Sequence, residues 1–264
     1  MANVIKIKKG LDINLKGKAS DVLLNGGKSD SYAIVPDYYN GIVPKVVAKV
    51  GEKVKAGSVL MIDKNRPEIK FVSPVSGEVT AVNRGEKRKV LSIVVKPDAQ
   101  IEYEEFGKKN VASLQGAEVK EVLLNAGMWP FIKQRPYDIV AAPLDTPRDI
   151  FVSAFYSAPL APNFDFIVKG QEADFQTGLN ALAKLTNGKV YVGVRSGSVV
   201  SGMKGVEIVE VEGPHPAANV GVQINHIKPV NKGEVVWTVN PADVIVIGRL
   251  FNLSLIHISE PTRP

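Results

Sequence analysis

Apolar and polar residues alternate along residues 40–97, and the alternating pattern occurs twice. The first copy runs from Gly41 to Leu60 and the second from Gly77 to Leu91, each with a Gly-Glu-Lys turn inside it. Period-two alternation between glycine turns is typical of half-buried strands. Two such strand–turn–strand units predict a small sandwich, because the Val-rich face of each hairpin can be buried on the other.

The residues between the two copies carry a more specific resemblance. The stretch from Leu60 to Gly77 resembles the hairpin of the biotinyl/lipoyl type of barrel-sandwich hybrid, a family that holds its cofactor on a lysine at the hairpin tip. The family's usual spacing, counted back from Gly77, falls on Arg66, and Lys64 lies two residues out of register. A guanidinium cannot form the amide that holds lipoate or biotin. We therefore expect an unmodified relative, with a carrier module acylated on Lys64 as the alternative.

The pattern changes after Pro97. Residues 99–113 predict a linker or a short edge element, and the domain boundary is placed there. Beyond it, helices are predicted at 119–126 and 171–187, strands at 150–155, 164–168, 189–194, 205–211 and 234–239, and a helix or strand at 240–247. Strands that alternate with helices favour an α/β domain with a largely parallel sheet.

These patterns predict a chain of mixed α+β and α/β class with two domains. Residues 1–110 form the barrel-sandwich hybrid, which includes an N-terminal strand at residues 4–8, and residues 111–252 form a Rossmann-like α/β domain. Residues 253–264 have no periodic continuity with what precedes them, and we interpret them as a non-native tail that is excluded from functional reasoning.

Composition narrows the possible functions. The chain has no cysteine, which excludes disulfides, thiolate iron–sulfur ligation and Cys-type zinc sites, and its three histidines do not form a convincing metal cluster. No apolar run approaches the ~20 residues of a membrane helix. The net charge of +6 is concentrated in the first 98 residues, but the lysines there alternate with apolar residues and not with aromatic ones. Nucleic acid is therefore not an expected partner.

Three segments together resemble the A subunit of the bacterial Na+-translocating NADH:quinone oxidoreductase. They are the opening Ile5–Ile13, the run from Leu123 through Gly127-Met-Trp-Pro-Phe to Ala154, and the run from Gly213-Pro-His-Pro-Ala to Asn240. The likeness covers nearly all of residues 1–252. Members of this family are longer than this chain, so we expect a natural C-terminal region to be absent.

The resemblance implies a peripheral subunit on the cytoplasmic face of the bacterial inner membrane. It implies that the complex couples NADH oxidation and ubiquinone reduction to sodium export, with the other pump subunits as partners. NADH and the flavins belong to those subunits, and this chain is expected to carry no cofactor, no metal and no catalytic residue of its own. The resemblance implies that this chain contributes to the end of the complex at which quinone is reduced.

The chain also resembles the flavin-binding subunit of proton-pumping complexes, which cradles flavin phosphate on a glycine-rich loop. The corresponding segment here is Gly127–Arg135. Its Trp129, Pro130 and Phe131 are bulky, and proline lacks the N–H that a phosphate needs. A working flavin-phosphate cradle is therefore not expected.

Five residues are candidates for contact with quinone or a partner, and each also has a structural interpretation. His215, between two prolines, could bond a quinone carbonyl or its own backbone, and His226 could do so or pack at a sheet edge. Trp129 and Phe131 could stack on a planar ring or anchor the core. Arg135 could pair with an acidic partner or form a structural salt bridge.

The sequence gives little support for a free-standing enzyme. No Ser-His-Asp arrangement or paired-carboxylate site stands out. The glycines of residues 193–202 follow a predicted strand, as in a nucleotide-binding turn, but no convincing helix follows them. A free-standing flavin or nicotinamide enzyme remains the alternative, and flavin absorbance or NADH oxidation by the isolated chain would reveal it.

Overall fold

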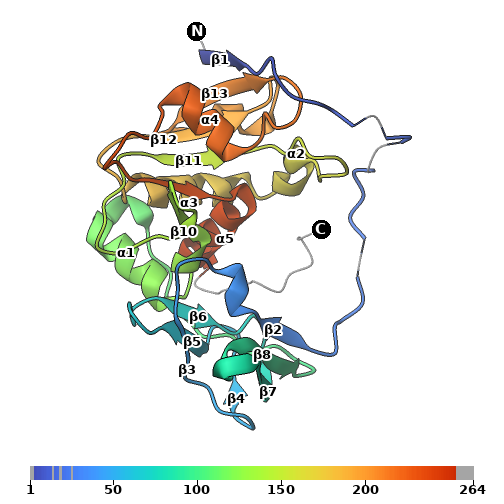
Figure 1. The fold of residues 1–264 in the computed structure, drawn as a ribbon, viewed down its shortest axis with the longest axis vertical. Helices are drawn as coiled ribbons and strands as arrows, with labels where there is room; N and C mark the ends of the chain where they lie inside the picture. The colour runs from blue at the N-terminus through green and yellow to red at the C-terminus, as the bar shows by residue number, and fades with distance from the viewer. Residues whose placement is uncertain (1–2, 14, 18–19, 25, 254–264) are drawn as a thin grey trace.

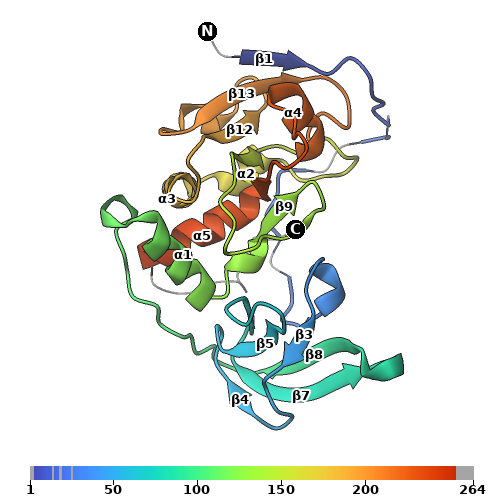
Figure 2. The same cartoon turned by 60° about the vertical axis from the view of Figure 1, so that its left-hand side comes forward.

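The computed structural model describes residues 3–13, 15–17, 20–24 and 26–253. Figures 1 and 2 show a strand-rich lower part and an upper part in which helices flank a larger sheet. The lower part is the predicted barrel-sandwich hybrid and the upper part the predicted α/β domain. Leu253, where the predicted tail begins, is the last residue of a helix, and residues 254–264 lie outside the described part of the chain.

The sandwich consists of two small antiparallel sheets. One has the order β2 (Tyr32–Ile34), β8 (Val90–Pro97), β7 (Gly77–Arg84) and β4 (Lys53–Val54). The other has the order β3 (Pro44–Val46), β5 (Val59–Asp63) and β6 (Lys70–Val72). Buried side chains from both sheets, including Leu60, Phe71, Val79 and Ile93, fill the space between them. The sandwich is thus built on the alternation seen in the sequence.

The two copies of the repeat fold differently, which corrects the expectation of two equal hairpins. The second copy forms the β7–β8 hairpin. The first copy is divided, because β3 pairs with β5 while β4 crosses to pair with β7 in the other sheet. Alternation identifies which face of a strand is buried, but it does not say which strand lies beside it.

The α/β domain has a seven-stranded sheet in the order β1-β13-β12-β11-β14-β9-β10. Its strands are β1 (Asn3–Lys6), β9 (Ile132–Arg135), β10 (Ile139–Val140), β11 (Ile150–Ser153), β12 (Val190–Val194), β13 (Glu207–Glu212) and β14 (Val236–Val239). The first five in the sheet order are parallel, and β9 and β10 are antiparallel. The predicted largely parallel sheet is confirmed.

The N-terminal strand is a second correction. The sequence pattern places it in the sandwich of residues 1–110, but β1 pairs in parallel with β13, so that Asn3 lies beside Val209 and Lys6 beside Glu212. Lys6 and Glu212 also form an exposed ion pair of 3.3 Å. The chain therefore starts in the α/β sheet and crosses to the sandwich before it returns (Figure 1).

Helices flank the sheet. They are α1 (Gly116–Asn125), α2 (Phe164–Val168), α3 (Glu172–Ala183), α4 (Val220–Ile227) and α5 (Pro241–Leu253), with short 3-10 turns at η1 (Pro36–Tyr38), η2 (Glu86–Arg88), η3 (Val111–Ser113), η4 (Trp129–Phe131) and η5 (Val199–Gly202). The predicted helices at 119–126 and 171–187 are confirmed, and the segment that begins at Pro241 is a helix. α3 and α5 pack against each other, and α4 contacts β11.

The predicted strand at 164–168 is wrong, because this segment is helix α2. The side chain of Asn163 accepts the backbone N–H of Asp165 and so caps the helix. Phe164 and Val168 are both buried, four residues apart on one helical face. Five apolar-rich residues fit a strand as well as one helical turn, and the cap decides between them.

Helices α3 and α5 approach closely at two glycines. A side chain at Gly178 would lie 2.0 Å from the Val244 carbonyl oxygen, and one at Gly248 would lie 1.7 Å from the Asp174 carbonyl oxygen. Neither position leaves space for a methyl group. The close contact between these helices therefore depends on both glycines.

Candidate functional site

Arg66, at the position where carriers hold their lysine, links the sandwich to the α/β domain. Its guanidinium donates to Asp63 Oδ2 at 2.8 Å, to the Gly41 carbonyl at 2.9 Å and to the Val140 carbonyl at 3.2 Å. Asp63 is buried, and its Oδ1 accepts two further backbone N–H groups. Lys64 is exposed. The hairpin tip is therefore occupied by a contact between domains.

The loop after α1 is the segment that corresponds to a flavin-phosphate cradle. Gly127 ends α1 with φ +67°, and a side chain there would lie 2.5 Å from Val72 of the sandwich. The N–H groups of Gly127 and Met128 donate to carbonyls of α1, that of Phe131 donates to the Met128 carbonyl, and Pro130 has none. The bulky side chains and these internal bonds make the loop a poor fit for a flavin phosphate.

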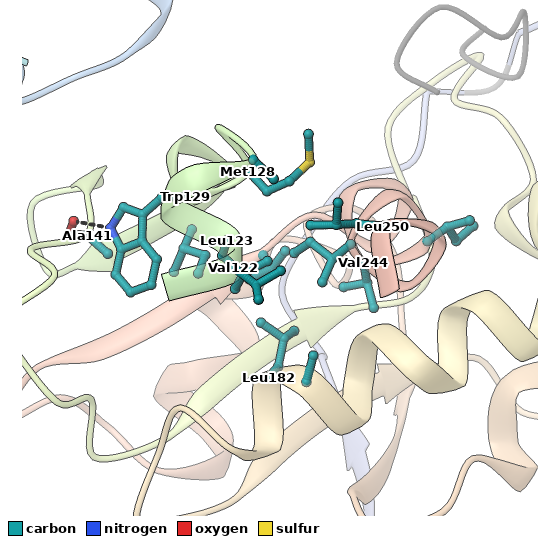
Figure 3. Close-up of a cluster of buried hydrophobic side chains, with 14 of the residues drawn as sticks. Val122, Leu123, Met128, Trp129, Ala141, Leu182, Val244 and Leu250 are labelled. Atoms are coloured by element: carbon teal, nitrogen blue, oxygen red, sulfur yellow. Dashed lines mark hydrogen bonds between the residues drawn. The ribbon is translucent and has the colours of Figure 1, made fainter. Parts of the chain in front are cut away.

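Trp129 belongs to this loop, and its side chain points into the core. It is fully buried, and its Nε1–H donates to the Ala141 carbonyl at 2.8 Å (Figure 3). Its ring meets that of Trp237 edge-on, with the ring centres 5.4 Å apart. An indole without an exposed face cannot stack on a ligand ring. Phe131 is half-buried and packs against the same core. These environments favour the core-anchor interpretation of both residues.

Lys133, which the sequence pattern does not single out, also lies where the two domains meet. Its Nζ is 5.4 Å from the centre of the Tyr39 ring, so a cation of the α/β sheet contacts an aromatic ring of the sandwich. Burial lowers the pKa of Lys133 below its ordinary value, while the nearby carboxylates of Asp138 and Asp243 oppose this effect. These two carboxylates thus offset part of the cost of burying the ammonium group.

Arg135, at the end of β9, has a partner within its own chain. Its Nη2 lies 3.4 Å from Asp138 Oδ1, and both side chains are partly exposed. Its Nε is buried and has no hydrogen-bond partner among the described residues. The geometry favours the structural salt bridge over pairing with an acidic partner.

His215 lies beyond the carboxyl end of β13 and is half-buried. Its Nδ1 is 3.0 Å from Ser157 Oγ, which accepts the N–H of Ala218 at 3.1 Å. Because that oxygen accepts from a backbone N–H, its own hydrogen can point toward the imidazole. Asp12 bonds the backbone N–H of His215 at 2.7 Å and not the ring. The arrangement is a Ser–His pair without the acid of a catalytic triad.

The interpretation of His226 as a sheet-edge residue is wrong. It lies on α4 and is exposed, and its Nδ1 is 2.8 Å from the Val222 carbonyl one turn earlier. His226 is four residues after Val222 in the helix, so its ring lies close to the Val222 carbonyl. The run of Ile and His residues around it is equally compatible with a strand, which is why the sequence misled.

The structure does not bring all the candidate residues together. β13 and β9 are the second and sixth strands of the sheet, which places them about 19 Å apart at the usual strand spacing. Arg135 pairs with Val236 at the start of β14, whereas His215 follows the carboxyl end of β13. His215 thus lies apart from the candidates of residues 129–135.

The carboxyl edge holds further residues that sequence reasoning missed. Ser153 and Gln223 are both buried, and Gln223 Nε2 donates to Ser153 Oγ at 2.9 Å. The Arg195 guanidinium lies 4.5 Å from the centre of the Phe155 ring and donates to the Gly213 carbonyl at 2.9 Å. The glycine-rich run of residues 193–202 was the signal for this edge. β12 and β13 lie on one side of β11, and α4 carries the chain across to β14 on its other side. Ligands of open α/β sheets usually bind at the carboxyl edge where the strand order reverses in this way.

Membrane-spanning helices and metal clusters are both absent from the described residues. None of the helices in that part of the chain is both long and apolar enough to cross a membrane. The same residues contain no group of three or more His, Asp or Glu side chains arranged to hold a metal ion.

The fold and its interface define a two-domain protein, in which a barrel-sandwich hybrid is fixed to a Rossmann-like α/β domain. Comparison with known families agrees. Residues 5–98 match the NqrA N-terminal barrel-sandwich hybrid domain, and residues 114–254 match the NqrA second alpha/beta domain. The chain therefore belongs to the NqrA family, the A subunit of the Na+-translocating NADH-quinone reductase.

Individual relatives are named as this same A subunit of the Na(+)-translocating NADH-quinone reductase. The protein of Hahella chejuensis is 40% identical over 253 residues, which cover 94% of this chain and 56% of that protein. Those of Photorhabdus laumondii and Neisseria meningitidis serogroup A are 37% and 38% identical, and the matches cover 96% and 94% of this chain. The chain spans 58% and 56% of the lengths of these two, a little over half of the curated relatives it matches.

Proposed function

We propose that this chain is a peripheral subunit of a Na+-translocating NADH:quinone reductase on the cytoplasmic face of the bacterial inner membrane. In this role it helps to shape the quinone-reducing end of a pump that couples NADH oxidation and quinone reduction to sodium export. The supporting observation is that two family domains match in the same order along nearly the whole described chain. The other pump subunits are its partners in this proposal.

The proposal assigns no redox cofactor to this chain. It is supported by the packing of Gly127 on Val72 and by the engaged N–H groups of the loop that follows α1. NADH and the flavins would be held by other subunits, which supply the electron transfer. This chain would then contribute shape and contact surface to the complex.

The proposed quinone contact is His215. It lies at the carboxyl edge of the sheet, its Nδ1 is engaged by Ser157, and no described residue bonds its Nε2. A bonded Nδ1 fixes the imidazole and leaves Nε2 to donate to a quinone carbonyl. In the assembled pump, His215→Gln should raise the KM for ubiquinone. The rate of NADH oxidation should stay unchanged when an artificial electron acceptor replaces ubiquinone. An unchanged KM would remove quinone contact from the proposal.

The membership of the complex is tested by co-purification. An affinity-tagged chain, expressed in a bacterium that has the pump, should recover the other pump subunits from solubilised membranes. An untagged strain and a tagged unrelated barrel-sandwich domain are the controls. Recovery of the tagged chain alone, from membranes in which the pump is assembled, would contradict the proposal.

The carrier alternative is tested by intact-mass measurement of the chain from the same cells. Arg66 is engaged in bonds to Asp63, Gly41 and Val140, which supports an unmodified hairpin. We expect the mass of the unmodified chain. A mass increase of one lipoyl or biotinyl group that disappears in Lys64→Arg would establish the carrier instead.

A further inference from the structure

A cavity of about 560 Å³ lies between the interdomain linker and the ends of α3 and α5. Its lining residues are Lys108, Lys109, Asn110, Val111, Ala112, Thr177, Asn180, Ala183, Lys184, Gly205, Phe251 and Asn252. Three of these side chains are cationic, and none of the described lining residues is acidic. The buried Val111 and Phe251 contribute apolar surface beneath the exposed lysines.

Two amide side chains of the cavity add donors to the three ammonium groups. Asn110 Oδ1 accepts the N–H of Ala112 at 3.0 Å, and Asn180 Oδ1 accepts from Gln176 Nε2 at 2.8 Å. Both amide oxygens are thus used within the chain. The two Nδ2 groups have no bonded acceptor among the described residues, so the cavity has an excess of donors.

A position at a helix end explains the charge of only one of the three cavity lysines. Lys184 is the C-cap of α3, where a cation offsets the negative pole of the helix. Lys108 and Lys109 belong to the linker. Neither is in an ion pair in the described part of the chain, where the paired lysines are Lys6, Lys53, Lys55, Lys89, Lys189 and Lys228. The linker lysines are therefore cations without a structural counter-ion.

We propose that this cavity binds the phosphate group of a small anionic molecule. Its volume falls within the range of about 300–1,000 Å³ that is usual for small-molecule sites. Lysine ammonium groups bind phosphate as point charges, and amide N–H groups complete the set of donors. The apolar surface beneath them would receive an organic portion of the ligand. The proposal is independent of quinone contact and is tested on the isolated chain.

The first experiment is isothermal titration of the chain with sodium pyrophosphate at low ionic strength. We expect saturable binding at one site that weakens by about tenfold or more in the double variant Lys109→Gln/Lys184→Gln. The matched control is Lys45→Gln/Lys49→Gln, which removes two exposed lysines of the sandwich and should bind as the unaltered chain does.

A second variant keeps the charge of the lysines. Asn180→Asp preserves the oxygen that Gln176 uses and replaces the donor group with an anionic oxygen. It should weaken pyrophosphate binding while circular dichroism and thermal unfolding stay unchanged. This variant separates a loss of binding from a loss of folding.

Vesicle sedimentation distinguishes a free phosphate from a lipid headgroup. Binding to phosphatidylglycerol vesicles but not to pyrophosphate, lost in Lys109→Gln/Lys184→Gln, would keep the phosphate site and assign its source to the lipid. Absence of binding to both probes would overturn the proposal, as would an equal loss in the Lys45→Gln/Lys49→Gln control. Saturable pyrophosphate binding that neither cavity variant changes would overturn it as well.

Discussion

At the scale of single residues, Arg66 shows what a substituted carrier position can do. The sequence predicts that no amide-linked cofactor forms there, because arginine is not lysine. It does not predict the bond to the Val140 carbonyl, which lies 74 residues further along the chain. A guanidinium has several donors in fixed directions, so one side chain can bond both Asp63 and two carbonyls.

Arg66→Ala should lower the free energy of unfolding by about 3 kcal/mol, because the buried Asp63 carboxylate would lose its paired charge. Guanidinium chloride unfolding measures this change. Lys64→Ala, two residues away and exposed, is the control and should change the stability by less than about 0.5 kcal/mol. Equal effects of the two substitutions would show that the Arg66 contact contributes nothing.

Asp149, directly before β11, should make the stability of the chain depend on pH in the acidic range. Burial by itself would raise the pKa of its carboxyl. Hydrogen bonds from Lys228, Lys189 and Arg148 together lower the pKa by more than burial raises it, so the folded pKa lies below the ordinary 3.8. Its stabilising effect is therefore complete above the unfolded pKa and is lost as the pH falls through the folded one. Asp149→Asn should cost about 3 kcal/mol at pH 7.

The difference between Asp149→Asn and the unaltered chain should then be smaller at pH 3 than at pH 7, because at pH 3 the unfolded carboxyl already binds a proton that the folded one binds less readily. Urea unfolding at both pH values measures it. Glu207→Gln breaks an exposed pair and should cost less than about 1 kcal/mol at either pH. A difference for Asp149→Asn that does not change with pH would contradict the ionised role of this side chain.

At the scale of elements, periodicity predicted long segments well and short or distant ones badly. α1 and α3 were found because their apolar spacing extends over several turns. α2 was missed because five residues do not reveal a period, and only Asn163 marks its start. The sheet partner of β1 could not be predicted, since its partner β13 is about 200 residues away and no local pattern names it.

The contact between α3 and α5 gives a prediction at this scale. Gly248→Ala should lower the free energy of unfolding by about 1–3 kcal/mol, because its methyl group would lie 1.7 Å from the Asp174 carbonyl oxygen and the helices would have to separate. Thermal unfolding measures this loss. Gly202→Ala, which has no atom within 4 Å of the added carbon, is the matched control. A similar stability of both variants would refute the close helix contact.

At the scale of the whole molecule, the two domains share one hydrophobic core. Phe71 and Val72 of the sandwich belong to the same buried cluster as Met128 and Trp129 of the α/β domain. Neither the repeat nor the helix pattern predicts this continuity, because each pattern describes one domain by itself. The same continuity places the sandwich over the loop after α1.

A shared core predicts that the two domains unfold together. Unfolding followed by tryptophan fluorescence, which reports on Trp129 and Trp237 in the α/β domain, should coincide with unfolding followed by far-ultraviolet circular dichroism, which reports on both domains. In Arg66→Ala the two transitions should move apart. Separate transitions in the unaltered chain would contradict a continuous core.

In our proposal, the packing of the sandwich on the loop after α1 is what leaves this chain without a redox cofactor. Flavin content is the decisive quantity, measured by absorbance and native mass spectrometry on the chain purified without denaturant from pump-containing membranes and separated from the other subunits. We expect the mass of the bare polypeptide and no flavin absorbance. One flavin for each chain, retained against Trp129 and Val72, would contradict the proposal.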